Sequence, residues 1–202
     1  SLSKIYTSMH LVDVQTKKYH IVKMTDQIME CLGKDFKKMG EYEIRDDFCG
    51  HIKNIVEKMC IESQLQESLE FVDINTLEER LLGENSITHE FTDKISGWNR
   101  SRFIPVDYDE DGKLLHVLFC IECIEEEKKR ENRLIYLAQT DLMTGLCNRG
   151  SGEKKITEFL KEKTGGLLCL IDCDKFKSIN DNYGHSVGDK VIIAVAEKLQ
   201  KT

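Results

Sequence analysis

Two carboxylates follow a short apolar run in residues 166–189, GLLCLIDCDKFKSINDNYGHSVGD. The run from Leu167 to Ile171 is typical of a strand buried on both faces. Asp172 and Asp174 come where that strand leaves the core, and they share one face because strand side chains alternate. Carboxylate oxygens are the ligands that Mg²⁺ prefers. The pattern therefore predicts a magnesium site at the end of a buried strand.

Polar residues at fixed offsets follow the two carboxylates. Lys175 and Lys177 add positive charge, and Asn180 and Asp189 offer an amide and a carboxylate that could bind the hydrogen-bonding edge of a base. Beside a magnesium ion, these groups predict a site for a nucleoside phosphate. The alternative interpretation is structural: the two aspartates only end a strand, and Asn180 with Asp181 only forms a turn.

Two motifs in this part of the chain resemble those of the GGDEF domain of diguanylate cyclases. Residues 141–149, DLMTGLCNR, are similar to the family's D-x-L-T-G-L-x-N-R opening, with Met143 in place of the usual Leu. Residues 171–189 resemble its I-D-x-D-x-F-K-x-I-N-D-x-x-G-H-x-x-G-D block, and residues 191–199, VIIAVAEKL, resemble the helix that follows. Gly150 stands where the family commonly has a larger residue. The resemblance covers roughly the last third of the chain.

The resemblance implies the family's reaction and assigns roles to matching residues. Diguanylate cyclases join two GTP molecules into cyclic di-GMP and release two pyrophosphates, with each subunit of a dimer presenting one GTP. By this resemblance Asp172 and the backbone carbonyl of Cys173 hold Mg²⁺. Asn180 and Asp189 bind guanine, and Lys177 contacts the triphosphate. The metal would activate a 3′-hydroxyl and neutralise charge on the α-phosphate.

The G-G-[DE]-E-F turn that names the family is absent from the 202 residues. In the family this turn supplies the remaining acidic metal ligand, and an R-x-x-D inhibitory site often precedes it. We therefore expect residues 1–202 alone to be inactive. A different interpretation remains open, in which a degenerate GGDEF domain binds GTP or cyclic di-GMP as an effector without catalysis.

Residues 1–123 predict a separate α+β unit. Two runs rich in strand-forming residues, Ile5–Val14 and Tyr19–Met24, are joined by a short polar turn and indicate a hairpin. One helix is expected after a cap at Asp46 or Asp47, and a second is expected from a capping box at Thr76 through Leu82. The apolar positions of the first helix are Phe48, Ile52, Ile55, Val56 and Met59.

Three further strands are predicted at residues 86–92, 98–108 and 113–123, the last two joined by the turn 109–112. This element order resembles that of a PAS domain, a kind of domain that commonly senses ligands or forms dimers. The sequence does not name a PAS ligand. Four aromatic residues could line a ligand cavity, although aromatic residues on strands more often form ordinary core. They are Phe91, Trp98, Phe103 and Phe119.

Residues 124–140, IEEEKKRENRLIYLAQT, contain no Gly or Pro and predict a continuous signalling helix between the PAS-like unit, 1–123, and the GGDEF-like part, 141–202. A heptad seam on this helix predicts weak parallel pairing, so we expect a homodimer through the PAS domain and the helix. A third interpretation is a PAS module for dimerisation or partner docking. The seam consists of Ile121, Ile124, Lys128, Glu131, Ile135, Ala138 and Leu142.

Composition limits the remaining possibilities. The net charge of −7 argues against nucleic-acid binding, because proteins that bind nucleic acid carry a basic face. No apolar stretch approaches the roughly 20 residues of a membrane span, and no signal peptide opens the chain. The eight cysteines are scattered, several of them in apolar runs, which favours buried thiols in a reducing cytoplasm. Cys120 and Cys123 form a CxxC in a predicted strand, where residues three apart face opposite sides.

The predicted fold class is therefore α+β. It combines a PAS-like antiparallel sheet domain, a linker helix, and the first half of a GGDEF domain, which is an α/β fold of the cyclase/polymerase palm type. We expect the fragment to be soluble and cytoplasmic.

Overall fold

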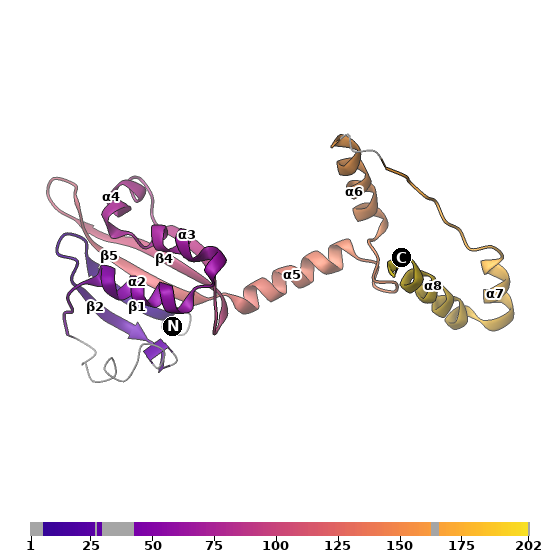
Figure 1. Ribbon diagram of the computed structural model, residues 1–202, viewed down its shortest axis with the longest axis horizontal. Helices are drawn as coiled ribbons and strands as arrows, with labels where there is room; N and C mark the ends of the chain where they lie inside the picture. Colours follow the sequence, from indigo (N-terminus) through magenta and orange to yellow (C-terminus); the bar gives the residue numbers. More distant parts are fainter. Residues whose placement is uncertain (1–5, 27, 30–42, 163–165, 202) are drawn as a thin grey trace. The chain divides into compact units, whose positions relative to one another are not determined.

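A computed structural model describes residues 6–26, 28–29, 43–162 and 166–201, and it divides the chain into two units, residues 1–128 and residues 129–202 (Figure 1). Ile5, at the start of the predicted hairpin, and Cys31, one of the eight cysteines, lie outside the described residues. No described helix is both long enough and apolar enough to cross a membrane.

Unit 1 is built on an antiparallel sheet of five strands in the order β2-β1-β5-β4-β3. The two strands of the N-terminal hairpin and the three later strands form where the alternating apolar pattern predicts them, to within one residue at most ends. The mixed α+β class and the PAS-like element order are therefore confirmed. The strands are β1 Tyr6–Asp13, β2 Tyr19–Met24, β3 Ile87–Asp93, β4 Gly97–Tyr108 and β5 Leu114–Cys123.

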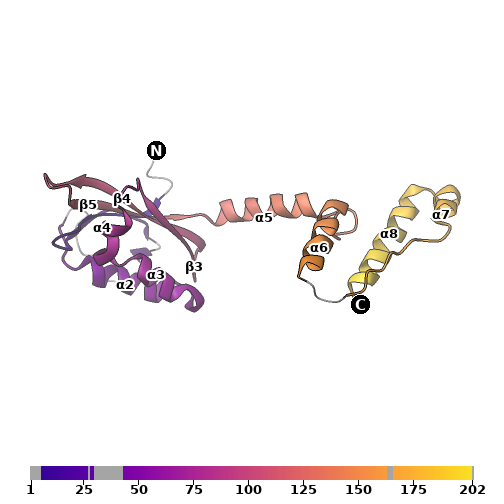
Figure 2. The same cartoon turned by 90° about the horizontal axis from the view of Figure 1, so that it is seen from above.

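Short helices connect β2 to β3 and lie on one face of the sheet (Figure 2). Asp47 caps the first of them, α2, by accepting a hydrogen bond of 2.8 Å from Gly50 N to its Oδ1. The capping box expected at Thr76 is wrong, because residues 74–76 already form a 3₁₀ turn and the Thr76 hydroxyl donates to Asp73 O at 3.3 Å. The helices are α2 Phe48–Met59, η3 Glu62–Gln64, α3 Leu65–Phe71, η4 Ile74–Thr76 and α4 Leu77–Arg80.

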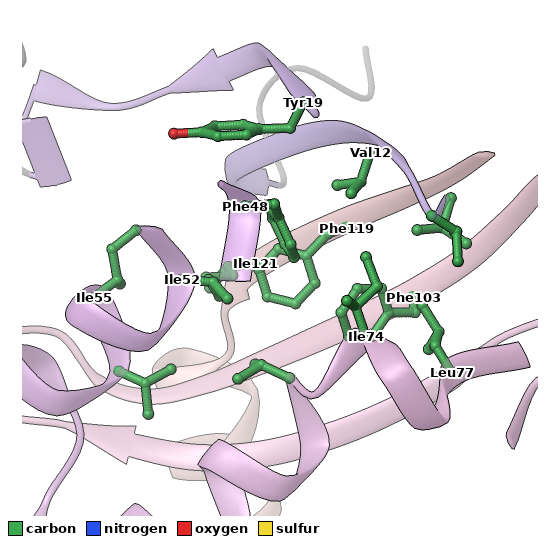
Figure 3. Close-up of a cluster of buried hydrophobic side chains, with 14 of the residues drawn as sticks. Val12, Tyr19, Phe48, Ile52, Ile55, Ile74, Leu77, Phe103, Phe119 and Ile121 are labelled. Atoms are coloured by element: carbon green, nitrogen blue, oxygen red, sulfur yellow. The ribbon is translucent and has the colours of Figure 1, made fainter. Parts of the chain in front are cut away.

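The core of unit 1 lies between this helical layer and the sheet (Figure 3). Phe119 of β5 is central, with ring-centroid distances of 4.6 Å to Phe103 of β4 and 5.8 Å to Phe48 of α2. Each of these side chains is at most 1% exposed. Because burying a large apolar side chain contributes about 1.5–3 kcal/mol, this aromatic contact ties α2 to the middle of the sheet.

A continuous helix, α5, spans Glu125–Gln139, as the sequence predicted to within one residue at each end. Three more helices follow it: α6 Arg149–Lys161, α7 Phe176–Tyr183 and α8 His185–Gln200. The helix expected at residues 191–199 forms the second half of α8. Asn180 and Asp181 lie inside α7, so the alternative that they form a turn is wrong.

The buried strand predicted at Leu167–Ile171 is absent from the structure. These residues are extended but unpaired, and the side chains of Leu167 and Leu170 are 91% and 101% exposed. A strand is stable only when neighbouring strands take up its backbone hydrogen bonds, and no described segment pairs with this one. Asp172 and Asp174 therefore do not end a strand here.

The predicted heptad seam is also wrong in its first half. Ile121 lies in β5, and Ile124 is only 3% exposed because it packs inside unit 1. Lys128 contacts Glu90 and Trp98 of the same unit, as described below. Of the seam, Glu131, Ile135 and Ala138 remain exposed on α5.

Only some of the cysteines have the buried thiols that the sequence predicted. Cys60 and Cys120 are buried, whereas Cys123, Cys147 and Cys169 are exposed. The exposed ones lie at a strand end, in a turn and in the unpaired run, where no second layer covers them.

Candidate functional site

The first motif, residues 141–149, forms a turn that ties the end of α5 to the start of α6. Thr144 donates a hydrogen bond from its Oγ1 to Asp141 Oδ1 at 2.7 Å, and this bond lowers the pKa of the Asp141 carboxyl. Gly145 has a φ of 71°, which the turn requires. Asn148 caps α6 by accepting from Ser151 N at 3.0 Å, while its Nδ2 donates to Ala138 O at 2.8 Å. The motif therefore joins the end of α5 to the start of α6 through hydrogen bonds of Asn148.

The second motif forms the paired helices α7 and α8. Gly184, with a φ of 83°, separates them and donates from its N–H to Asn180 O at 2.9 Å. A left-handed residue at a helix end costs least when it is Gly. The turn brings Asn180 of α7 against Gly188 of α8, where a Cβ on residue 188 would lie 2.0 Å from Asn180 Oδ1. Gly188 is therefore required for the position of Asn180.

The acceptor oxygen of Asn180 is the most unusual polar atom of this region. Asn180 Oδ1 is buried, and no hydrogen-bond donor reaches it among the described residues. Leaving such an acceptor unpaired costs about 1–3 kcal/mol. The oxygen lies against Gly188, and it would accept an N–H group of a ligand, such as those on the Watson–Crick edge of guanine, only after the side chain turns away from that contact.

The other predicted site residues lie at the surface of the same unit. Asp172, Lys177 and Asp189 have exposed side chains, and Asp189 directly follows Gly188, which contacts Asn180. The carbonyl of Cys173 accepts a hydrogen bond from Phe176 N at 3.3 Å and keeps a second lone pair. A carboxylate and a carbonyl form the oxygen donor set that fits Mg²⁺. No group of three or more metal-ligating side chains occurs among the described residues, so this pair is an incomplete ligand set.

In unit 1, the first turn of α5 is fixed to the sheet by hydrogen bonds and an ion pair. Trp98 O accepts from Ile124 N at 2.9 Å, and Trp98 N donates to Glu125 Oε2 at 3.0 Å. The Lys128 ammonium lies 5.4 Å from the centroid of the Trp98 ring and 2.7 Å from Glu90 Oε2. Both backbone groups of Trp98 thus bind the start of α5.

Arg100 of β4 extends this contact on the outer side of the sheet. Its guanidinium pairs with Glu127 of α5 at 2.9 Å, with Glu90 of β3 at 2.7 Å and with Glu122 of β5 at 3.2 Å. These hydrogen bonds, that to Glu127 foremost, raise the pKa of Arg100. Hydrogen bonds from Lys128 and Arg100 lower the pKa of Glu90. We call Glu90, Arg100, Glu122, Glu127 and Lys128 the helix-base network.

Substitution of Gly97 tests the contact between Glu125 and Trp98. Gly97 has a φ of 79°, and an added Cβ would lie 2.4 Å from Glu125 Oε2. Gly112, at a φ of 80°, has nothing within 4 Å and is the matched control. Both Gly→Ala changes cost about 1–2 kcal/mol for the left-handed backbone. We expect Gly97→Ala to cost a further ~1–2 kcal/mol, because the carboxylate must leave Trp98 N.

Urea unfolding measures the free-energy cost of each Gly→Ala change. Double variants then show whether Glu125 causes the difference between the two costs. In a Glu125→Ala background the two Gly→Ala changes should cost the same. A difference that persists there would show that the contact with Glu125 is not the cause.

Unit 1 also contains a cavity of about 130 Å³, lined by residues of the sheet and of α2 and α3. Phe91 and Phe119, two of the four aromatic candidates, line it. Phe103 is 0% exposed and belongs to the packed core, as the alternative interpretation expected.

The C-terminal part of the chain is similar to a known protein family. Residues 138–202 match the family model "Diguanylate cyclase, GGDEF domain". The match includes both motifs, on which the resemblance to this family was based.

Several curated proteins resemble the chain in part. The diguanylate cyclase DgcM of Escherichia coli is 41% identical over 88 residues, which are 42% of this chain and 22% of that protein. The uncharacterized protein YtrP of Bacillus subtilis is 39% identical over 69 residues, 34% of this chain and 12% of that protein. The cyclic di-GMP phosphodiesterase PdeB of Shewanella oneidensis is 29% identical over 92 residues, 46% of this chain and 11% of that protein. The matches thus span at most about a fifth of these three relatives.

A solved structure of a sensory box histidine kinase/response regulator from Burkholderia thailandensis is also similar to part of the chain. It has 12% sequence identity and a TM-score of 0.36, over 63% of this chain and 83% of that one.

Sequence reasoning missed two features of these regions. Gly188 lies within the recognised block but had no assigned role, and a tight α7–α8 contact became visible only in the structure. The helix-base network joins residues from three strands and a helix, and the sequence gives no signal for such distant pairing. The cavity was considered from its aromatic residues alone, two of which line it.

Proposed function

We propose that this chain is the sensory part and the first portion of the catalytic domain of a diguanylate cyclase, which makes cyclic di-GMP from two GTP molecules. The observation that carries the proposal is the match of residues 138–202 to the GGDEF family model, which covers both motifs. The domain division proposed with it is a PAS-like sensor at 1–123, a signalling helix at 124–140 and the GGDEF portion at 141–202. A cytoplasmic location follows from the same proposal, because the substrate GTP is cytoplasmic.

The proposed roles of the site residues follow from their chemistry and position. Asp172 and the Cys173 carbonyl would hold Mg²⁺, and Lys177 would contact the triphosphate. Asn180 and Asp189 would bind guanine, and the buried, donor-free Oδ1 of Asn180 supports this assignment. The metal, when bound, supplies charge neutralisation at the α-phosphate. In this proposal the residues of the chain orient the nucleotide so that its 3′-hydroxyl meets a second GTP.

A homodimer belongs to the proposal because each subunit presents one GTP to the other. The exposed face of α5 around Ile135 and Ala138 supports pairing through the helix. The helix-base network supports a role for α5 in regulation, because any movement of β3 or β4 would act directly on the first turn of the helix. The cavity in unit 1 favours a sensory role over a purely docking role for the PAS-like unit.

Residues 1–202 alone should not convert GTP and Mg²⁺ to cyclic di-GMP, because the described metal-ligand set is incomplete. Chromatographic quantification of cyclic di-GMP after prolonged incubation measures this. Product above the level of a Asp172→Ala control would refute the prediction that the fragment is inactive.

The helix-base network gives a further prediction, which concerns Arg100. We expect Arg100→Met to raise the hydrogen exchange of amides in the first turn of α5, since three carboxylates lose their shared cation. The free energy of local opening in the first turn of α5 should fall by about 2–3 kcal/mol, which is in the range for hydrogen bonds to charged groups. Exchange of the amides in the middle of β1 should stay unchanged.

Arg102→Met is the matched control for this experiment. Arg102 lies two residues along β4 and 3.9 Å from Glu122, so its loss removes the same charge without touching α5. Equal exchange in the two variants would contradict a specific role of Arg100 at the base of the helix.

A further inference from the structure

The cavity of unit 1 has a lining from which the chemistry of a ligand can be inferred. Much of its apolar wall comes from α2 and from β5, whose side chains converge in Figure 3. Ile52, Ile55, Phe119 and Ile121 are labelled there. An apolar protein cavity of about 150 Å³ is large enough to hold benzene. At about 130 Å³, this cavity suits a molecule built around a single ring or an aliphatic chain of similar size.

A row of polar side chains crosses the inner face of the sheet in this apolar surrounding. Ser101 of β4 pairs with His89 of β3, whereas Ser8 of β1 is separated from Ser101 by Ile121 of β5, with which both serines pair. Directly opposed residues of neighbouring strands have Cβ atoms about 4.5–5.5 Å apart. Ser68 of α3 closes the row, with its Oγ 3.0 Å from His89 Nε2. All four side chains line the cavity.

The hydroxyls of this row offer hydrogen-bond acceptors to the cavity. Ser101 donates its proton to His89 O at 3.2 Å, so its oxygen keeps two lone pairs. Ser8 and Ser101 are 1% and 3% exposed. Ser8 Oγ lies 3.2 Å from His10 Nδ1 and Ser68 Oγ lies 3.0 Å from His89 Nε2, so these two hydroxyls already have hydrogen-bond partners. The two lone pairs of Ser101 Oγ can accept from a ligand that donates one hydrogen bond.

The charges of the lining exclude an ionised ligand. Asp93 is the one ionisable carboxylate among the described lining residues, and its oxygens accept hydrogen bonds from Ile95 N, Ser96 N, Ser96 Oγ and Asn99 Nδ2. These four bonds fill about all the acceptor positions of a carboxylate. No Lys or Arg is among the described lining residues. Burial lowers the pKa of His89, the histidine of the lining, which favours its uncharged form. An anion would therefore meet no countercharge, and a cation would meet no free carboxylate oxygen.

We propose that unit 1 binds a small uncharged molecule, about the size of one aromatic ring, with a single hydroxyl that donates to the serine row. Binding of this molecule does not depend on the catalytic proposal, because every residue of the site lies in unit 1.

The experiment uses three ring compounds of nearly equal size on the chain of residues 1–202. Phenol carries the donor, benzene lacks it, and benzoate carries a negative charge. Titration calorimetry should give the tightest binding for phenol, binding about 2–10-fold weaker for benzene, as expected from one hydrogen bond, and no binding for benzoate. Shifts of the backbone amides of residues 89, 101 and 121 in NMR spectra should accompany the binding.

Variants of residues that line the cavity test whether the ring compounds bind there. Ser101→Ala should bring the affinity for phenol down to that for benzene and leave benzene unchanged, whereas Ser63→Ala, at an exposed serine outside the cavity, should change neither. Ile121→Phe should abolish binding of both rings, and an unchanged cooperative thermal transition would show that this variant folds. Benzoate binding as tight as phenol binding, or no binding of any ring to the folded wild-type chain, would overturn the proposal.

Discussion

Replacement of Asp172 by Ala in a longer chain that continues through a complete GGDEF domain should reduce the rate of cyclic di-GMP synthesis roughly 10²–10³-fold. In the proposed site this carboxylate is one of the few oxygen ligands that hold the metal. A bound divalent ion contributes several kcal/mol to the stabilisation of transition-state charge, and each ~1.4 kcal/mol corresponds to about tenfold in rate. The side chain is exposed, so its loss should leave the fold intact.

The measurement is the steady-state rate of cyclic di-GMP formation at saturating GTP over a range of Mg²⁺ concentrations. Glu197→Ala removes an exposed carboxylate on α8, outside the proposed site, and is the matched control. The Asp172 variant should also need more Mg²⁺ to reach its half-maximal rate. A rate within twofold of wild type would remove Asp172 from the metal site.

Replacement of Asn180 by Ala should weaken the preference for GTP over ATP by roughly 10²-fold or more. A site that hydrogen-bonds specific donors of its substrate can discriminate by about 10⁴–10⁵, and Asn180 would supply one of the two base contacts. The variant should lose no thermal stability, because the acceptor that it removes is buried without a donor among the described residues. Loss of selectivity without loss of stability is typical of a binding residue.

Competition between GTP and ATP in the same assay measures this preference. Asn182→Ala, at an exposed position two residues further along α7, is the control and should keep the wild-type preference. If Asn180→Ala lowers the melting temperature by several degrees and leaves the nucleotide preference unchanged, then Asn180 is a packing residue of the α7–α8 contact.

Local patterns in the sequence predict most of unit 1. The strands, the turn at residues 109–112 and the helix capped by Asp47 follow from alternation, turn residues and capping, which act over a few residues. The strand order was not predicted, because the pairing of β1 with β5 joins segments that are far apart in the chain. The helix-base network could not be predicted, since Glu90, Arg100 and Glu127 meet only after three strands and α5 have assembled.

The run at residues 167–171 shows the limit of a local pattern. Its apolar composition indicates burial, but a strand depends on partners that lie elsewhere in the chain, and none of the described residues supplies them. The residues of the predicted site also differ in how far contacts with other described segments position them. Asn180 and Gly188 meet through a contact between neighbouring helices, whereas Asp172 lies on the unpaired run.

The central claim is that the chain belongs to an enzyme that makes cyclic di-GMP, and the most direct test is a turnover assay. The longer chain with a complete GGDEF domain is incubated with GTP and Mg²⁺, and both products are quantified. The account predicts steady accumulation of cyclic di-GMP with two pyrophosphates released for each molecule formed. Stoichiometric binding of GTP or cyclic di-GMP without turnover would contradict it and would identify the protein as a nucleotide-binding effector.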